Sequence, residues 1–152
     1  MIIFIPIKEN SQRVPNKNFR EFRGNPLWVH LVKKLKNFNV FIDTDSDEII
    51  QSSKSIDYVT AFKRSEALRG DKISVVDLLK NFTRDFKIHE PICQIHATSP
   101  FLSVEHIEEA KRIANDAEAI VYAINYYYNK MQALKAWVLL GEGVNPNENK
   151  KQ

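Results

Sequence analysis

The stretch IIFIPIKENSQRVPNKNF, residues 2–19, joins a short apolar run to a basic segment. The run at 2–7 is continuously apolar, which is typical of a parallel strand that is buried on both faces. Lys8, Arg13 and Lys17 follow it, and Glu9 is the one carboxylate among them. On charge alone, this segment is either a solvated loop or a site for phosphate groups. It is not a Walker phosphate-binding loop, because no glycine occurs before Gly24.

The composition indicates one globular domain. The chain has 152 residues, of which 43% are hydrophobic and 27% charged, values that are usual for a soluble protein. We expect a single domain over 1–140 and a polar, disordered tail over 141–152. One cysteine excludes an internal disulfide framework, and no apolar run is long enough for a signal sequence or a membrane span. The sequence therefore predicts a cytoplasmic protein that does not contact a membrane.

Positive charge is concentrated near the N-terminus. Residues 8–36 hold eight lysines or arginines and two glutamates, a balance of +6, whereas the rest of the chain holds fourteen basic and seventeen acidic residues. Such a local excess suits a polyanionic ligand, either a nucleotide or a nucleic acid. The overall charge of +3 is too small to argue for binding to duplex DNA.

Strand and helix patterns alternate along the first 125 residues. We predict strands at 2–7, 39–43, 57–62, 91–97 and 119–125, with amphipathic helices at 25–38, 46–54, 73–82 and 104–117. Asn25 and Ser103 are predicted helix caps. This order predicts an α/β fold with a mostly parallel sheet and helices on both faces, three layers in all. The apolar stretch 126–140 has no clear helix or strand period.

Four loops are expected to meet at one edge of this sheet. Ligands of such folds bind beyond the carboxyl ends of the parallel strands. The segments that leave those ends are 8–18, 43–47, 63–72 and 96–101. The basic segment should therefore lie beside the other three.

Four segments in this order carry a resemblance to a known family. They are IPIKENSQRVPNKNFREFRGNPL (5–27), VFIDTDSDEI (40–49), KRSEALRGDKISVVDLL (63–79) and QIHATSPFLSVEHIEEA (94–110). The first resembles the N-terminal signature of the acylneuraminate cytidylyltransferases, or CMP-sialic acid synthetases. The others resemble that family's strand ending in Ser/Thr-Asp, its Arg-x-x-x-x-L-x-x-Asp-x-x-Ser segment and its Gln-x-Thr-Ser-Pro turn.

The resemblance implies a fold and a reaction. The fold is that of the nucleotide-diphospho-sugar transferases, and the reaction couples CTP to an acidic 2-keto sugar such as a sialic acid, with release of pyrophosphate. Magnesium is the implied cofactor, CTP and an acidic sugar are the implied ligands, and a homodimer is possible. Nucleic acid is not an expected partner.

The resemblance also assigns residues by position. Lys8, Arg13 and Lys17 would hold the triphosphate and form the catalytic set. The nucleotide-binding set would be Ser11, Gln12, Asn18, Arg64, Asp71 and Ser74. His96, in the place of the family's usual glutamine, would bind the sugar with Thr98 and Ser99.

Departures from the family pattern leave other interpretations open. Lys8 replaces an arginine, Glu9 and Asn10 replace small residues, and the family's C-terminal segment has no match beyond Asn125. A shortened relative that binds nucleotide or a protein partner without turnover is the alternative, and a small nucleic-acid-binding domain is a third hypothesis.

Three further features have two interpretations each. The metal ligands are not identified, and the acidic cluster DTDSD at 43–47 is better explained by helix capping through Asp45 or Ser46 than by metal binding. His96 is either a proton shuttle or, preferably, a hydrogen-bonded histidine at a strand end. The tyrosines at 126–128 could stack on a base, but core or interface packing is favoured.

Overall fold

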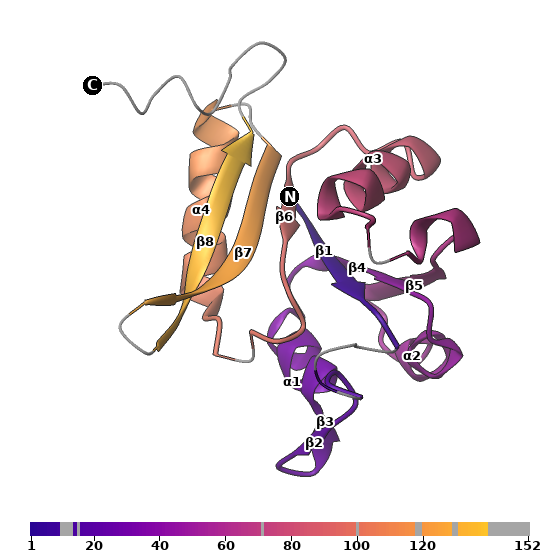
Figure 1. Ribbon diagram of the computed structural model, residues 1–152. Helices are drawn as coiled ribbons and strands as arrows, with labels where there is room; N and C mark the ends of the chain where they lie inside the picture. The colour runs from indigo at the N-terminus through magenta and orange to yellow at the C-terminus, as the bar shows by residue number, and fades with distance from the viewer. Residues whose placement is uncertain are drawn as a thin grey trace.

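A computed structural model describes residues 1–9, 14, 16–70, 72–99, 101–117, 120–128 and 131–139 (Figure 1). The strands are β1 (Ile2–Ile7), β2 (Glu21–Phe22), β3 (Asn25–Pro26), β4 (Asn39–Thr44), β5 (Val59–Lys63), β6 (Ile92–Gln94), β7 (Ile120–Tyr128) and β8 (Met131–Leu139). The α-helices are α1 (Leu27–Lys34), α2 (Asp47–Ser53), α3 (Val75–Asp85) and α4 (Val104–Ala117), and a 3-10 turn spans Glu66–Leu68.

A four-stranded parallel sheet forms the centre of the fold. Its strand order is β5-β4-β1-β6, and every neighbouring pair runs parallel. The order follows from the sequence, because the most apolar run, β1, takes a central position where both of its faces are covered. The predicted α/β class is confirmed.

The side chains of β1 alternate between two core clusters. Ile3, Ile5 and Ile7 pack in one cluster with residues of α1, with Ile49 of α2 and with two residues of α4. Ile2 and Phe4 pack on the opposite face with α3. Helices therefore cover both faces of the sheet, as the sequence predicts.

Aromatic residues dominate the face that α3 covers. Phe82 of α3 is fully buried and lies 4.9 Å from Phe4, 5.0 Å from Phe41 and 5.8 Å from Phe62, between ring centroids. Ring pairs at these separations stabilise a core beyond their buried area. This aromatic cluster forms the core between α3 and the sheet.

The last two strands correct the prediction for the end of the domain. The strand predicted at 119–125 exists as β7, but it pairs antiparallel with β8 in a separate two-stranded sheet. The segment without a clear period is thus largely strand. Figure 1 shows this hairpin beside β6 and α4. The predicted tail at 141–152 lies outside the described residues.

The predicted cap at Asn25 is wrong. Asn25 and Pro26 form β3, which pairs with β2 in a small hairpin, and α1 begins at Leu27. The turn uses Arg23 and Gly24 at φ angles of 47° and 79°, a region that glycine adopts without strain. Tertiary pairing of the Asn-Pro segment thus replaced the capping role.

Within the described residues, no helix combines the length and the apolar character that a membrane span requires.

Candidate functional site

The first loop begins where β1 ends, and Lys8 is its first residue. Lys8 Nζ donates a hydrogen bond to the Gly70 carbonyl at 3.4 Å. Asn18 is buried, and its side-chain amide donates to the Lys8 carbonyl at 3.0 Å. Asn18 therefore folds the loop back onto its own start. Ser11, Gln12 and Arg13 lie outside the described residues.

The second loop anchors the first one. The Asp45 carboxylate accepts a hydrogen bond from the Glu9 backbone N–H at 2.7 Å, and Ser46 Oγ donates to the Glu9 carboxylate at 3.4 Å. Ser46 occupies the N-cap position of α2, but no side-chain cap bond is formed there. Ser46 is therefore at the predicted N-cap position of α2, but its side chain does not make the hydrogen bond that capping predicts. Asp47 and Glu48 do place acidic groups in the first turn, as expected for a helix dipole.

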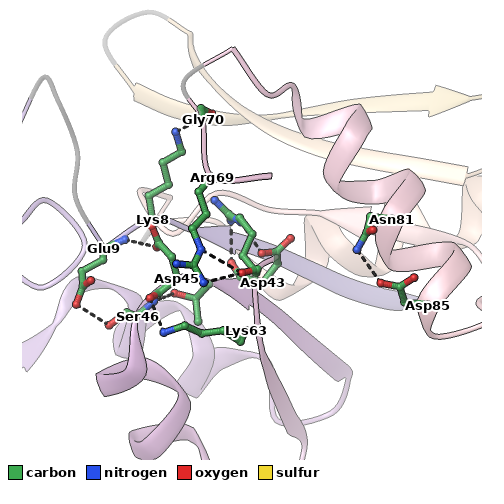
Figure 2. Close-up of polar contacts among 12 residues, drawn as sticks. Lys8, Glu9, Asp43, Asp45, Ser46, Lys63, Arg69, Gly70, Asn81 and Asp85 are labelled. Atoms are coloured by element: carbon green, nitrogen blue, oxygen red, sulfur yellow. Dashed lines mark hydrogen bonds and ion pairs between the residues drawn. The ribbon is translucent and has the colours of Figure 1, made fainter. Parts of the chain in front are cut away.

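A buried ion pair joins the second loop to the third. Arg64 Nε lies 2.6 Å from Asp43 Oδ1, and Arg64 Nη2 donates to the Asp43 carbonyl at 3.0 Å (Figure 2). Burial raises the pKa of Asp43, while the Arg64 charge and hydrogen bond oppose that shift. Arg64, assigned by resemblance to the nucleotide, thus uses two of its nitrogens to hold the protein together.

In the third loop, a side chain binds the backbone of the same loop. The Arg69 guanidinium donates to the Arg64 carbonyl through Nε at 3.2 Å and through Nη2 at 3.0 Å. Gly70, next in the chain, accepts the bond from Lys8. Asp71, another nucleotide-binding prediction, lies outside the described residues.

Ser74 is the N-cap of α3. Its hydroxyl accepts from the Asp77 backbone N–H at 3.2 Å, and its own backbone N–H donates to the Asp77 carboxylate at 3.0 Å; these two bonds form a capping box. The hydroxyl also donates to the same carboxylate at 2.7 Å. These bonds lower the pKa of Asp77. The structure therefore gives Ser74 a local role in addition to the one that the resemblance implies.

His96 extends β6 at the same edge of the sheet. β6 ends at Gln94, which pairs with Phe4 of β1. If this register continues for two residues, His96 lies level with Pro6, and Pro6 pairs with Asp43 on the other side. His96 and Asp43 are therefore on the same face of the sheet. Burial lowers the pKa of His96, and the positive charge of Lys17 acts in the same direction. Both effects favour the neutral form of the imidazole.

The turn after His96 places Thr98 and Ser99. The Ser99 backbone N–H donates to the His96 carbonyl at 3.0 Å, and Ser99 Oγ is buried without a hydrogen-bond partner. Thr98 is half-buried. Among the described residues no hydrogen bond of the His96 side chain occurs, so the preferred interpretation of a hydrogen-bonded histidine stays a prediction.

The described residues contain no cluster of three side chains suited to a metal ion. The acidic cluster at 43–47 is already engaged, because Asp43 binds Arg64, Asp45 binds the Glu9 backbone and Asp47 lies 2.6 Å from Lys63. These carboxylates do not fit a magnesium site built from protein side chains.

The four loops thus meet as the sequence predicts. Lys8 binds the third loop at Gly70, Asn18 binds Lys8 within the first loop, and Arg64 binds Asp43 at the end of β4. The charge of Lys17 acts on His96 of the fourth loop by lowering its pKa. Sequence reasoning missed the contact of the Arg69 guanidinium with the Arg64 carbonyl. It also missed the pairing of Asp43 with Arg64.

Comparisons with known proteins agree with this architecture. The chain is 26% identical over 137 residues to pseudaminic acid cytidylyltransferase of Campylobacter jejuni, a match that covers 84% of this chain and 59% of that protein. It is 32% identical over 104 residues to N-acylneuraminate cytidylyltransferase A of Danio rerio, covering 66% of this chain and 24% of the relative. CMP-N,N'-diacetyllegionaminic acid synthase of Legionella pneumophila is 30% identical over 121 residues, covering 74% and 52% respectively.

A solved structure shows the same fold. The structure of CMP:2-keto-3-deoxy-manno-octonic acid synthetase complexed with CTP matches with a TM-score of 0.63 at 17% identity, covering 99% of this chain and 68% of that one. The chain spans about 59% of the length of the Campylobacter relative. The family model described as cytidylyltransferase matches residues 2–150. This chain belongs to the cytidylyltransferase family.

Proposed function

We propose that this protein couples CTP to an acidic 2-keto sugar, giving a CMP-sugar and pyrophosphate. The observation that carries the proposal is the meeting of the first loop with the third loop and with His96. Lys8 contacts Gly70, and the pKa of His96 is lowered first by burial and then by the charge of Lys17. Cations of the first loop therefore act on the loop that follows β5 and on His96, which follows β6.

The reaction needs positioning and charge neutralisation more than covalent help. The oxygen of the sugar hydroxyl attacks the α-phosphorus of CTP and forms a new P–O bond. The bond from that phosphorus to the oxygen that bridges to the β-phosphorus breaks, pyrophosphate leaves, and the hydroxyl proton passes to solvent. Lys8 and Lys17, with Arg13, would hold the triphosphate and stabilise the negative charge that moves to the leaving group. His96, kept neutral, would accept or donate a hydrogen bond to the sugar without adding charge.

Magnesium remains part of this proposal as an ion that CTP brings. Magnesium in phosphate sites is held by one or two carboxylates, water and substrate phosphates. Because Asp43, Asp45 and Asp47 already have partners in the protein, the nucleotide would supply most of the magnesium ligands. When bound, the ion would neutralise phosphate charge.

The sugar is proposed at the level of its class. The matched relatives act, by their names, on pseudaminic acid, N-acylneuraminate and diacetyllegionaminic acid. These share a carboxylate and the anomeric hydroxyl that attacks phosphorus. We propose an acceptor of this acidic class, and a homodimer stays a prediction.

The test is release of pyrophosphate from CTP and magnesium in the presence of a panel of 2-keto sugar acids. We expect release with at least one acid, and no release when the acid is omitted. CTP binding measured by calorimetry accompanies the assay. Binding of CTP without turnover on any acid would contradict the coupling reaction, and would support the nucleotide-binding alternative.

A further inference from the structure

Asp43 and Arg64 lie at the same level of two neighbouring strands. β4 and β5 run parallel, and Asp43 pairs with Phe62 in their register. Side chains two residues apart on a strand share a face, so Arg64, two residues after Phe62, falls on the face that carries Asp43. The Arg64 backbone N–H donates to the Thr44 carbonyl at 2.7 Å and extends the pairing beyond β5. The backbone therefore places the guanidinium beside the carboxylate.

This ion pair leaves Arg64 almost no surface for a ligand. Its side chain is 1% exposed, and that of Asp43 is 3% exposed. Two donors, Nε and Nη2, bind two acceptors of Asp43, the carboxylate at 2.6 Å and the backbone carbonyl at 3.0 Å, so the guanidinium plane is fixed. A ligand could bind this guanidinium only by breaking both bonds and leaving a buried carboxylate without its counter-ion, which is strongly unfavourable. Arg64 is therefore poorly suited to contact a nucleotide that must enter and leave.

The third loop is built on the residue that Asp43 holds. The Arg64 carbonyl accepts two hydrogen bonds from the Arg69 guanidinium, at 3.2 Å and 3.0 Å. Between these residues, the Leu68 backbone N–H donates to the Ser65 carbonyl at 3.0 Å, and Leu68 packs against the core cluster between α3 and the sheet. These contacts fold the segment into a compact turn whose position depends on Arg64.

The same loop contacts a cation of the first loop. Gly70 follows Arg69, and its carbonyl accepts a hydrogen bond from Lys8 Nζ at 3.4 Å (Figure 2). Lys8 is one of the cations proposed to hold the triphosphate. A continuous series of contacts therefore runs from Asp43, through Arg64 and its loop, to Lys8. Such contact networks carry coupling between residues, and small misplacements of positioned groups have large effects on function.

We propose that Asp43 is a positioning residue for CTP: it fixes Arg64, and Arg64 holds the third loop in its binding conformation without touching the nucleotide. This rests on the proposed function, which supplies CTP as the ligand. Arg64 thereby has a different role from the direct contact that the resemblance implies. The two roles predict opposite effects when the charge of Asp43 is removed.

Asp43→Asn separates these two roles. Asparagine has nearly the same shape and keeps an oxygen that can accept from Arg64, but it carries no charge. If Arg64 binds phosphate directly, loss of the competing carboxylate strengthens CTP binding. If Asp43 positions the loop, the weaker bond loosens it, and we expect calorimetry to show CTP binding about tenfold weaker. Unchanged or tighter binding would overturn the proposal.

A double-variant cycle tests whether the two residues act as a unit. Arg64→Gln should also weaken CTP about tenfold. In Asp43→Asn/Arg64→Gln the glutamine Nε2 follows the same number of bonds as the arginine Nε that binds Asp43, so the two amides can restore that hydrogen bond. Because residues of one network have non-additive effects, we expect the double variant to bind CTP at least about threefold more tightly than Arg64→Gln. A double variant that binds no more tightly would contradict the positioning role.

Calorimetry also separates positioning from a general loss of stability. Unfolding lowers the number of binding sites, whereas a misplaced loop changes the dissociation constant of each folded molecule. Leu35→Ala is the control for stability, because Leu35 is fully buried at the end of α1. Arg84→Gln/Asp85→Asn is the control for an exposed ion pair. Both controls should keep the wild-type dissociation constant, and equal weakening by Leu35→Ala and Asp43→Asn would exclude a specific role of Asp43.

A measurement on the wild-type protein covers variants that do not fold. The Arg64 Nε–H gives its own resonance in a ¹⁵N–¹H NMR spectrum, and its buried bond to Asp43 should make it exchange slowly with solvent. This slow exchange should persist in saturating CTP, with the exposed Arg84 as the rapidly exchanging reference. Rapid exchange of Arg64 in the free protein, or faster exchange with CTP, would refute the proposal. A wild-type protein that does not bind CTP would overturn both proposals, and CTP binding without turnover would overturn the coupling reaction alone.

Discussion

Arg64 and Asp43 form a buried ion pair, with 2.6 Å between Nε and Oδ1, that connects the ends of two neighbouring strands. Asp43 belongs to β4, and Arg64 follows the last residue of β5. The Arg64 backbone N–H also donates to the Thr44 carbonyl at 2.7 Å. Both the side chain and the backbone of Arg64 thus fix the start of the third loop to the sheet.

We predict that Arg64→Ala lowers the free energy of unfolding by about 3 kcal/mol or more, because it leaves a buried carboxylate unpaired. The double variant Asp43→Leu/Arg64→Met removes both charges and should be less destabilised than Arg64→Ala. Urea denaturation of the three proteins measures these differences. A loss of less than about 1 kcal/mol in Arg64→Ala would mean that water reaches Asp43, as at a surface pair.

The capping box of α3 predicts a smaller effect. Ser74→Ala removes the hydroxyl that binds the Asp77 backbone and carboxylate. We expect a loss of about 1 kcal/mol, the usual contribution of an N-cap hydroxyl. Ser74→Thr keeps the hydroxyl and should retain most of the stability. Thermal unfolding of both variants provides the comparison, and equal melting temperatures for alanine and wild type would exclude the cap as a stabilising element.

The pKa of His96 predicts a dependence of stability on pH. Burial lowers the pKa of His96 below the ordinary histidine value of 6.5, which the unfolded chain recovers. Between these two values the unfolded state binds more protons, so the free energy of unfolding falls as the pH drops below about 6.5. His96→Gln should remove this part of the dependence. Denaturation at about pH 8 and pH 5 tests it, and parallel losses in wild type and variant would contradict it.

Most of the fold could be predicted because most of its strands and helices are indicated by the residues within each segment. Strands β1 and β4 are short apolar runs, and α3 and α4 have clear helical periods and capping residues. The rule that parallel strands present their carboxyl ends at one edge then predicts that the loops meet. No knowledge of side-chain contacts is needed for that step.

The errors arise where distant residues decide the structure. Asn25 has a good local cap signal, but pairing with the segment at 21–22 places it in a strand. β7 leaves the parallel sheet because β8, a segment of ambiguous period, pairs with it. In the site, Asp43 and Arg64 are 21 residues apart, so sequence position alone could not show that they neutralise each other.

Lysines of the basic segment should contribute unequally to CTP binding, and this prediction tests the whole site. Lys17 belongs to the loop after β1, and its charge lowers the pKa of His96, whereas Lys33 lies on α1 and donates to the Asn25 side chain at 3.1 Å. If the site holds the triphosphate by direct contact, Lys17→Ala weakens CTP binding about tenfold, as does Arg13→Ala if its sequence assignment holds. Lys33→Ala and Lys34→Ala change the net charge equally but should have little effect. Calorimetry at two salt concentrations distinguishes contact from a diffuse field, because screening weakens distant charges first. Equal effects of all four variants, vanishing together at high salt, would mean that the basic segment attracts CTP without binding it.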